Sequence, residues 1–249
     1  MGEKEQNRFY TSISENYSEI FPYKPMQLKF VKSEIGDLKY CTVLDIGCAT
    51  GELAFQLANE GAEVIGIDLN EDLLSQAKLK IDGSDLIFQK VDMLELENDF
   101  KPNQFDSVLC FGNTLVHLPS EYLIRKMLDG VFSILKTGGT FLLQILNYNY
   151  ILGEQVSELP IIETGNIRFI RKYSFEDFPM IRFKTDLLIK KSDEIISNET
   201  MLLALKSTQL KSLLLESGFS DIEMYSNFKK ESFGGQHLPL VVSCTKIRN

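Results

Sequence analysis

The sequence predicts an α/β protein built on a doubly wound, mainly parallel β-sheet. Between residues 42 and 146, apolar runs of strand length alternate with amphipathic segments of helix length. This alternation is typical of βαβ units, in which crossover helices join parallel strands. The strand candidates are almost continuously apolar, as expected when helices cover both faces of a sheet.

The predicted elements of this region follow one another in regular order. Strands are expected at 42–47, 63–68, 86–91, 105–111 and 140–146, and helices at 51–60, 70–81 and 120–136. Gly61 is placed to end the first helix, and a polar loop is expected at 95–104. The segment KTGG at 136–139 predicts a turn before the fifth strand.

The pattern changes after residue 146. Two runs rich in β-branched and aromatic residues within 166–190 predict an antiparallel hairpin, with 195–204 as a third strand. A helix at 207–217 and strands at 221–226 and 239–246 follow, and the last two strands have no helix between them, which favours an antiparallel pair. We therefore expect a core of residues 1–146 and 206–249, with a helical cap at 1–35 and an antiparallel β insertion at 147–205.

Composition excludes several classes of partner. The formal net charge of −9 disfavours nucleic acid, because an acidic surface repels phosphates. The four cysteines form no CxxC pair and there are only two histidines, so neither a disulfide nor a metal site is expected. No apolar run reaches the length of a membrane span or of a signal peptide. We expect a soluble cytoplasmic protein without a membrane partner.

A glycine-rich turn lies in the segment LDIGCATGELAFQL at 44–57, between a strand and a helix. The GxGxxG fingerprint of dinucleotide sites, aligned on Gly47, meets Ala49 and Glu52 in place of the second and third glycines. Asp45 and Glu52 add negative charge where a pyrophosphate needs positive potential. S-adenosylmethionine carries an ammonium and a sulfonium but no phosphate, so the charges favour it.

A second acidic residue, Asp68, ends the predicted strand at 63–68. A carboxylate at this place commonly holds the two hydroxyls of a ribose. The alternative role is capping of the next helix, but Asn70 is better placed for that. Asp68 therefore favours a nucleoside ligand.

Five segments in register resemble the class I S-adenosylmethionine-dependent methyltransferases of the small-molecule type: VLDIGCATG, EVIGIDLNEDLLSQAK, KVDM, FDSVLCFGN and LKTGG. The resemblance covers about residues 8–146 and, more loosely, 207–246. Ala49 stands where the family often has glycine, and Thr137 where proline is usual. The resemblance implies a Rossmann-like fold with seven strands, of which the last is antiparallel.

The same resemblance implies a set of residues around S-adenosyl-L-methionine. Asp68 would hold the ribose, Leu69 would pack on the adenine, and Tyr17, a better match than Tyr10, would cover the cofactor. The remaining implied contacts are Asp45, Gly47, Cys48, Ala49 and Gly51 at the methionine end, Asp92 and Met93 at the adenine, and Phe111 and Gly112 beneath the methionine.

Methyl transfer is an in-line displacement, so the protein mainly positions the acceptor and excludes water. A neutral amine needs no general base, whereas a hydroxyl often does. His117 follows the fourth strand and is the first candidate for a base or substrate contact; its alternative is a hydrogen bond to the backbone. Asn113, in GNTLVHL, resembles an asparagine near the acceptor of glycine/sarcosine-type N-methyltransferases, with a turn role as its alternative.

The insertion at 147–205 is expected to form a lid over a small-molecule acceptor or the contact of a homodimer. Arg168, Arg171, Arg182, Tyr148 and Tyr173 are candidates to face an anionic substrate, but alternation does not say which of them point inward. The leading hypothesis is transfer of a methyl group to N or O of a small metabolite. The alternatives are a non-catalytic S-adenosylmethionine-binding regulator and an NAD(P)-dependent oxidoreductase. The sequence does not identify the acceptor.

Overall fold

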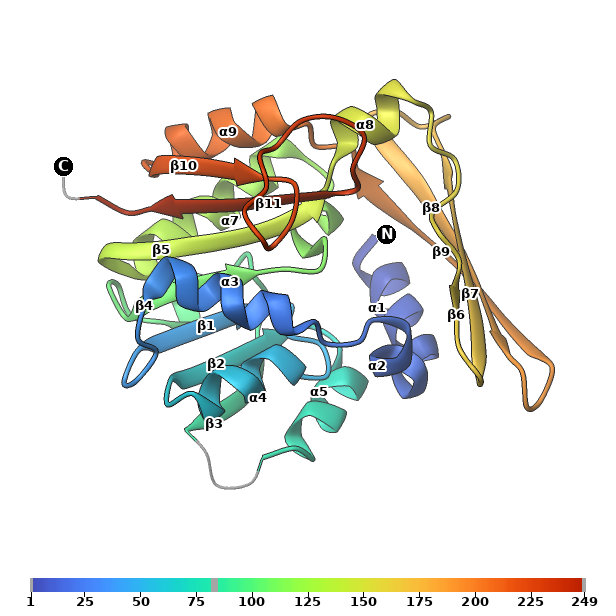
Figure 1. The fold of residues 1–249 in the computed structure, drawn as a ribbon, viewed down its shortest axis with the longest axis horizontal. Coiled ribbons are helices and arrows are strands. Elements are labelled where there is room, and N and C mark those ends of the chain that lie inside the picture. Colours follow the sequence, from blue (N-terminus) through green and yellow to red (C-terminus); the bar gives the residue numbers. More distant parts are fainter. Residues whose placement is uncertain (1, 82–84, 248–249) are drawn as a thin grey trace.

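The larger of two β-sheets has the topology that the sequence predicts. The structure is a computed structural model and describes residues 2–81 and 85–247, with side chains described from residue 7 onward. The strand order is β3-β2-β1-β4-β5-β11-β10 (Figure 1). The strands are β1 (Thr42–Ile46), β2 (Glu63–Asp68), β3 (Leu86–Lys90), β4 (Phe105–Cys110), β5 (Leu135–Leu146), β10 (Ser220–Tyr225) and β11 (Pro239–Thr245). Only β11 runs antiparallel to its neighbours within this sheet, as expected for the last strand.

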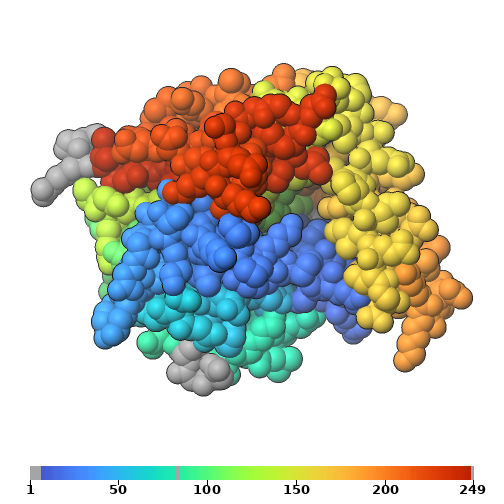
Figure 2. Space-filling view, viewed as in Figure 1, coloured from blue at the N-terminus to red at the C-terminus, as the bar shows by residue number. Residues whose placement is uncertain are grey.

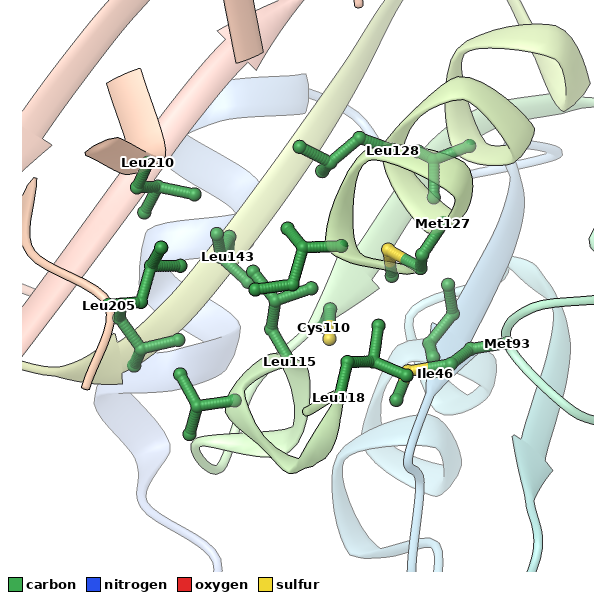
Figure 3. Close-up of a cluster of buried hydrophobic side chains, with 14 of the residues drawn as sticks. Ile46, Met93, Cys110, Leu115, Leu118, Met127, Leu128, Leu143, Leu205 and Leu210 are labelled. Atoms are coloured by element: carbon green, nitrogen blue, oxygen red, sulfur yellow. The ribbon is translucent and has the colours of Figure 1, made fainter. Parts of the chain in front are cut away.

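Helices cover both faces of this sheet because the strands are apolar on both sides. Along β1, Val43 faces one cluster of buried side chains, while Leu44 and Ile46 face another. The first cluster includes residues of α3 (Pro25–Ile35), α4 (Glu52–Asn59) and α5 (Glu71–Lys78). The second, shown in part in Figure 3, includes residues of α6 (Leu96–Asp99), α7 (Glu121–Ile134) and α9 (Ser207–Glu216).

The insertion forms a second sheet that lies to one side of the core (Figure 1). After α8 (Tyr148–Gly153) come β6 (Ile162–Glu163), β7 (Ile167–Ser174), β8 (Met180–Ile189) and β9 (Glu194–Leu203), antiparallel and in that order. The predicted hairpin and third strand are thus present, and β6 adds a short edge strand.

The N-terminal helices join the two sheets. They are α1 (Gly2–Ile13), the 3-10 turn η1 (Ser14–Asn16) and α2 (Tyr17–Ile20). Phe9, Ile13 and Ile20 pack against Phe169 and Leu187 on the inner face of the insertion. On the face shown in Figure 2, the blue N-terminal part of the chain lies directly against the yellow insertion.

Two local predictions differ from the structure. The polar loop expected at 95–104 contains the one-turn helix α6, because Leu96 is buried in the core and orders the segment around it. The strand expected to begin at 140 begins at Leu135, since Leu135 already pairs with Phe105 and the KTGG turn forms an irregularity within the strand. Neither difference moves the carboxyl ends of the central strands.

Candidate functional site

A cavity lies at the carboxyl edge of the parallel strands, where β1 sits between β2 and β4. This is the point at which the strand order reverses, and open α/β sheets bind ligands there. The free space is about 720 Å³, its solvent-open mouth included. The cavity is lined by Asn7, Tyr10, Tyr17, Ile46, Gly47, Ala49, Ile67, Asp68, Leu69, Asn70, Leu73, Val91, Met93, Gly112, Thr114 and His117.

The turn after β1 requires glycine at two positions. The Gly47 and Cys48 amides both donate to the Ile67 carbonyl, at 2.8 and 3.0 Å, which holds the turn against β2. Gly47 has φ +71°, and a Cβ on it would lie 2.6 Å from Oγ1 of Thr114. Gly51 has φ +77°, and a Cβ there would collide with the Phe88 ring. The glycines therefore allow close packing behind the turn, which leaves Gly47 and Ala49 at the cavity surface.

The carboxylate of Asp68 is held in place by backbone amides. Its Oδ2 accepts from the Ala49 N–H at 3.0 Å and its Oδ1 accepts from the Asn70 N–H at 2.9 Å. Burial raises the pKa of Asp68, and hydrogen bonds from backbone amides oppose that effect. Because each carboxylate oxygen can accept more than one hydrogen bond, Asp68 keeps acceptor capacity toward the cavity.

Asp45 and Glu52, the two acids of the turn, do not line the cavity. Asp45 is 4% exposed, and burial together with the nearby Asp68 raises its pKa to about 7. Burial acts to raise the pKa of Glu52, but hydrogen bonds from Lys80, Ser18 and Thr50 outweigh it and lower that pKa. Glu52 forms an ion pair with Lys80 at 2.7 Å. Its negative charge therefore does not support the choice of S-adenosylmethionine over a dinucleotide, as the sequence suggested.

His117, in the 3-10 turn η2 (Thr114–His117) after β4, contacts the N-terminal helix. Its Nε2 lies 2.9 Å from the Tyr10 hydroxyl. Burial lowers the pKa of His117 to about 4, so the imidazole is neutral at pH 7. A neutral imidazole has its proton on Nδ1 if Nε2 accepts from Tyr10, and on Nε2 if Nε2 donates to the Tyr10 oxygen. Nδ1 is buried without a hydrogen-bond partner among the described residues.

The structure brings eight of the sequence-predicted site residues together at the cavity. They are Tyr17, Gly47, Ala49, Asp68, Leu69, Met93, Gly112 and His117. Tyr10, ranked below Tyr17 in the sequence, lines the cavity as well, and burial raises the pKa of both phenols.

Six predicted residues lie outside the cavity lining: Asp45, Cys48, Gly51, Asp92, Phe111 and Asn113. The Asp92 side chain accepts from the Leu94 amide at 2.9 Å, and the Phe111 ring packs against Phe30 and Phe228.

The Asn113 side chain forms hydrogen bonds within the protein. With φ +69°, it accepts from the Leu146 amide at 2.9 Å and donates to the Tyr148 hydroxyl at 3.2 Å. This is the turn role that the sequence left as its alternative.

Sequence reasoning missed several residues of the lining. Asn7 gave no signal, because its contribution depends on where α1 docks. Thr114 followed a recognised strand end and could have been found there. Asn70 was assigned only to capping, and its side chain does accept from the Leu73 amide at 2.9 Å. It also donates to the carbonyl and side chain of Asn7 and to the Thr11 hydroxyl, which ties α1 to the start of α5.

Two general properties hold for residues 2–81 and 85–247. No helix there is long and apolar enough to cross a membrane. That part of the chain also contains no group of three or more His, Cys, Asp and Glu side chains arranged to hold a metal ion.

Known proteins with similar sequences are methyltransferases by name. A putative methyltransferase, YqeM, of Bacillus subtilis (strain 168) is 30% identical over 139 residues, which are 55% of each chain. The glycine/sarcosine/dimethylglycine N-methyltransferase of Actinopolyspora halophila is 30% identical over 210 residues, covering 78% of this chain and 34% of that protein. The chain thus spans about half the length, or less, of these curated relatives.

The fold is shared with solved structures. A S-adenosylmethionine-dependent methyltransferase from Clostridium acetobutylicum ATCC 824 superimposes with a TM-score of 0.80 at 16% identity, covering 96% of this chain and 100% of that one. Residues 37–162 match the family model described as methyltransferase domain, a region that contains the turn, Asp68 and His117. The chain therefore belongs to the methyltransferase domain family.

Proposed function

We propose that this protein transfers a methyl group from S-adenosylmethionine to N or O of a small metabolite by in-line displacement. The observation that carries the proposal is the Asp68 carboxylate, fixed by the Ala49 and Asn70 amides at the cavity surface. This arrangement suits a ribose diol, whose two hydroxyls both donate to one carboxylate.

The remaining lining fits the rest of the cofactor. Leu69, Val91 and Met93 offer an apolar surface for adenine, while Gly47 and Gly112 leave backbone groups exposed to the methionine portion. Asp45, behind the turn, would lend negative charge for an ammonium once ionised. When bound, S-adenosylmethionine supplies a methyl group that its sulfonium has already activated.

The chain's own residues position the acceptor and exclude water. Tyr10 and Tyr17 cover the cavity from the N-terminal helices, and His117 lies at its edge. Nε2 of His117 pairs with Tyr10 and burial lowers the pKa of the imidazole to about 4, so His117 is a weak base and serves as a contact. A neutral amine needs no base, so these contacts favour N over O as the acceptor atom. Asn113 acts indirectly, because it holds the turn after β4 by accepting from the Leu146 amide and donating to the Tyr148 hydroxyl.

We also propose a role for the insertion, a cellular location and a class of acceptor. The insertion would act as the acceptor-side lid, with a homodimer contact as its alternative role. A cytoplasmic location fits the absence of a membrane-spanning helix in the described residues. The relatives include a glycine/sarcosine/dimethylglycine N-methyltransferase, which is named for small acceptors, and a ubiquinone biosynthesis O-methyltransferase of Nitrosomonas europaea, which is named for a biosynthetic pathway.

Calorimetric titration tests the cofactor. We expect S-adenosylmethionine to bind and NAD not to bind, and the reverse result would support the oxidoreductase alternative. Asp68→Asn should weaken S-adenosylmethionine by about ten- to a hundredfold, as expected for a lost charged hydrogen bond. Asp72→Asn, an exposed acid in the first turn of α5, is the matched control and should bind as the wild type does. Unchanged affinity in Asp68→Asn would refute the ribose role.

Turnover separates the enzyme from a regulator. Labelled methyl from S-adenosylmethionine should appear in small molecules of a desalted metabolite extract, and heat-denatured protein serves as the blank. Binding without any transfer to the extract would favour the non-catalytic alternative.

A further inference from the structure

The inner face of the insertion carries buried polar atoms that have no partner within the described chain. They are Nε of Arg171, the hydroxyl of Tyr173 and Oγ1 of Thr185. Tyr173 is 6% exposed and Thr185 is 2% exposed. Leaving a buried donor unpaired costs free energy, and native proteins pair nearly all such groups with protein, water or ligand. Three such atoms in adjacent strand positions can all be satisfied by one bound group.

Strand register places these residues side by side. Arg171 on β7 pairs with Thr185 on β8, which pairs with Asn198 on β9. Tyr173 lies in the next row of the same face, opposite Phe183. Side chains two residues apart along a strand share a face, so these polar groups face the same way.

This polar row separates two apolar regions. Below it, Phe169 and Leu187 pack on α1 and α2. Above it, Ile181 and Leu202 pack on the main core. A row with no binding role would gain stability from apolar side chains here, because both neighbouring rows are buried in hydrophobic clusters.

Arg171 carries a positive charge without a matching carboxylate. Its Nη2 donates to the Pro160 carbonyl at 2.7 Å, and no acidic side chain of the described residues lies within 4.0 Å of its guanidinium. The outward arginines differ: Arg168 lies 4.0 Å from Glu163, and Arg182 lies 2.9 Å from Asp177 and 2.7 Å from Glu199. In a chain of net charge −9, an unpaired and partly buried arginine is a site for an anion.

The row lies near the cavity, because β9 packs against η2, whose Thr114 and His117 line the cavity. Asn198 donates to the Ser12 hydroxyl at 2.8 Å, so the row contacts α1, whose Tyr10 lines the cavity two residues earlier. Tyr173 also belongs to the same buried cluster as Tyr148, whose hydroxyl accepts from Asn113 after β4.

We propose that Arg171, Tyr173 and Thr185 bind the carboxylate of the methyl acceptor, so that the acceptor is a small amino acid or hydroxy acid. This assignment rests on the proposed methyl transfer and names its substrate class. A carboxylate accepts hydrogen bonds from the guanidinium and both hydroxyls, and its single charge balances that of Arg171. The acidic chain disfavours a doubly charged phosphate at the same place.

Titration of small carboxylates tests the assignment. S-adenosylhomocysteine is titrated first, and the saturated protein is then titrated with glycine, β-alanine, 4-aminobutyrate and lactate, with their amides and with phosphoethanolamine. We expect at least one carboxylate to bind, and its amide to bind at least tenfold more weakly. If no carboxylate of the panel binds, or phosphoethanolamine binds more tightly than all of them, the assignment is overturned.

Variants locate the binding. Arg171→Gln should weaken the carboxylate about ten- to a hundredfold while leaving S-adenosylhomocysteine affinity unchanged. Arg168→Gln, on the same strand but the outer face, should match the wild type. Tyr173→Phe removes only the unpartnered hydroxyl, so it should weaken the carboxylate without lowering thermal stability. Equal carboxylate binding in Arg171→Gln and Arg168→Gln contradicts the assignment. Failure of the first titration contradicts the proposed function itself.

Discussion

The Tyr10 hydroxyl lies 2.9 Å from Nε2 of His117, although 107 positions separate the two residues in the chain. The contact joins α1 to the turn after β4, and both residues line the cavity. It makes the N-terminal helix part of the site, and it pairs Nε2 of His117 with a hydroxyl.

Replacing Tyr10 by Phe tests this relationship. The variant loses one hydrogen bond and leaves Nε2 unpaired in a buried place, so the free energy of unfolding should fall by about 1–2 kcal/mol. Tyr17→Phe is the control, because the Tyr17 ring also lines the cavity while its hydroxyl makes no hydrogen bond to the described residues. Urea denaturation measures both, and an equal loss in the two variants would contradict the special role of Tyr10.

Asp45 and His117 should act in opposite directions on stability between pH 4 and 7. Folded Asp45 keeps its proton to about pH 7 while the unfolded carboxyl has lost it, so this residue lowers the unfolding free energy as pH rises. Folded His117 stays neutral down to about pH 4, while the unfolded imidazole is protonated below pH 6.5. This residue therefore raises the unfolding free energy as pH rises. Each contribution reaches at most about 3 kcal/mol.

Single variants should separate the two effects on the pH dependence of the unfolding free energy. Asp45→Asn should become more stable relative to the wild type as pH rises from 4 to 7, and His117→Asn should become less stable relative to it from pH 4 to 6.5. Urea denaturation of the ligand-free protein at half-unit pH steps measures the difference. Parallel curves for all three proteins would mean that neither group titrates as its burial indicates.

Gly47→Ala should damage both stability and cofactor binding. The added Cβ meets Oγ1 of Thr114 at 2.6 Å, and the residue has φ +71°, so we expect a loss of about 2 kcal/mol or more. Gly153→Ala is the control, since nothing lies within 4 Å of its added Cβ. Adding Thr114→Ala should recover the steric part but not the backbone strain. Full recovery, or no loss in the single variant, would contradict this account.

Asn70→Ser should loosen the N-terminal helix without unfolding α5. Serine still caps α5 through its hydroxyl, but the donations to Asn7 and Thr11 are lost. Hydrogen exchange should therefore quicken at residues 7–13 and stay as in the wild type at residues 71–78. Equal acceleration in both segments would show that the cap, and not the tether to α1, had failed.

Much of the main fold could be predicted, because local patterns specify it. The apolar runs placed β1, β2 and β4 within a residue or two, and Gly61 does have a positive φ after its helix. The errors occurred where tertiary contacts override local polarity, as at Leu96, which orders a short helix within an otherwise polar segment.

The site could be predicted only in part. Residues that lie at strand ends, such as Gly47, Asp68, Met93 and Gly112, line the cavity because parallel strands end at a common edge. For neighbours such as Asp92 and Phe111, the side chain can point toward the cavity or away from it. Sequence order does not determine that direction, and packing turned both of them away.

By itself, the sequence determined the succession of strands and helices along the chain, the turn after β1 and the acid after β2, because these depend on contacts between near neighbours and on backbone conformation. Only the tertiary structure decided that Lys80 forms an ion pair with Glu52 and that Tyr10 forms a hydrogen bond with His117. It also decided that Arg171 faces inward while Arg168 and Arg182 face outward. Such pairings depend on how distant segments dock, and alternation along a strand is the same whichever face is buried.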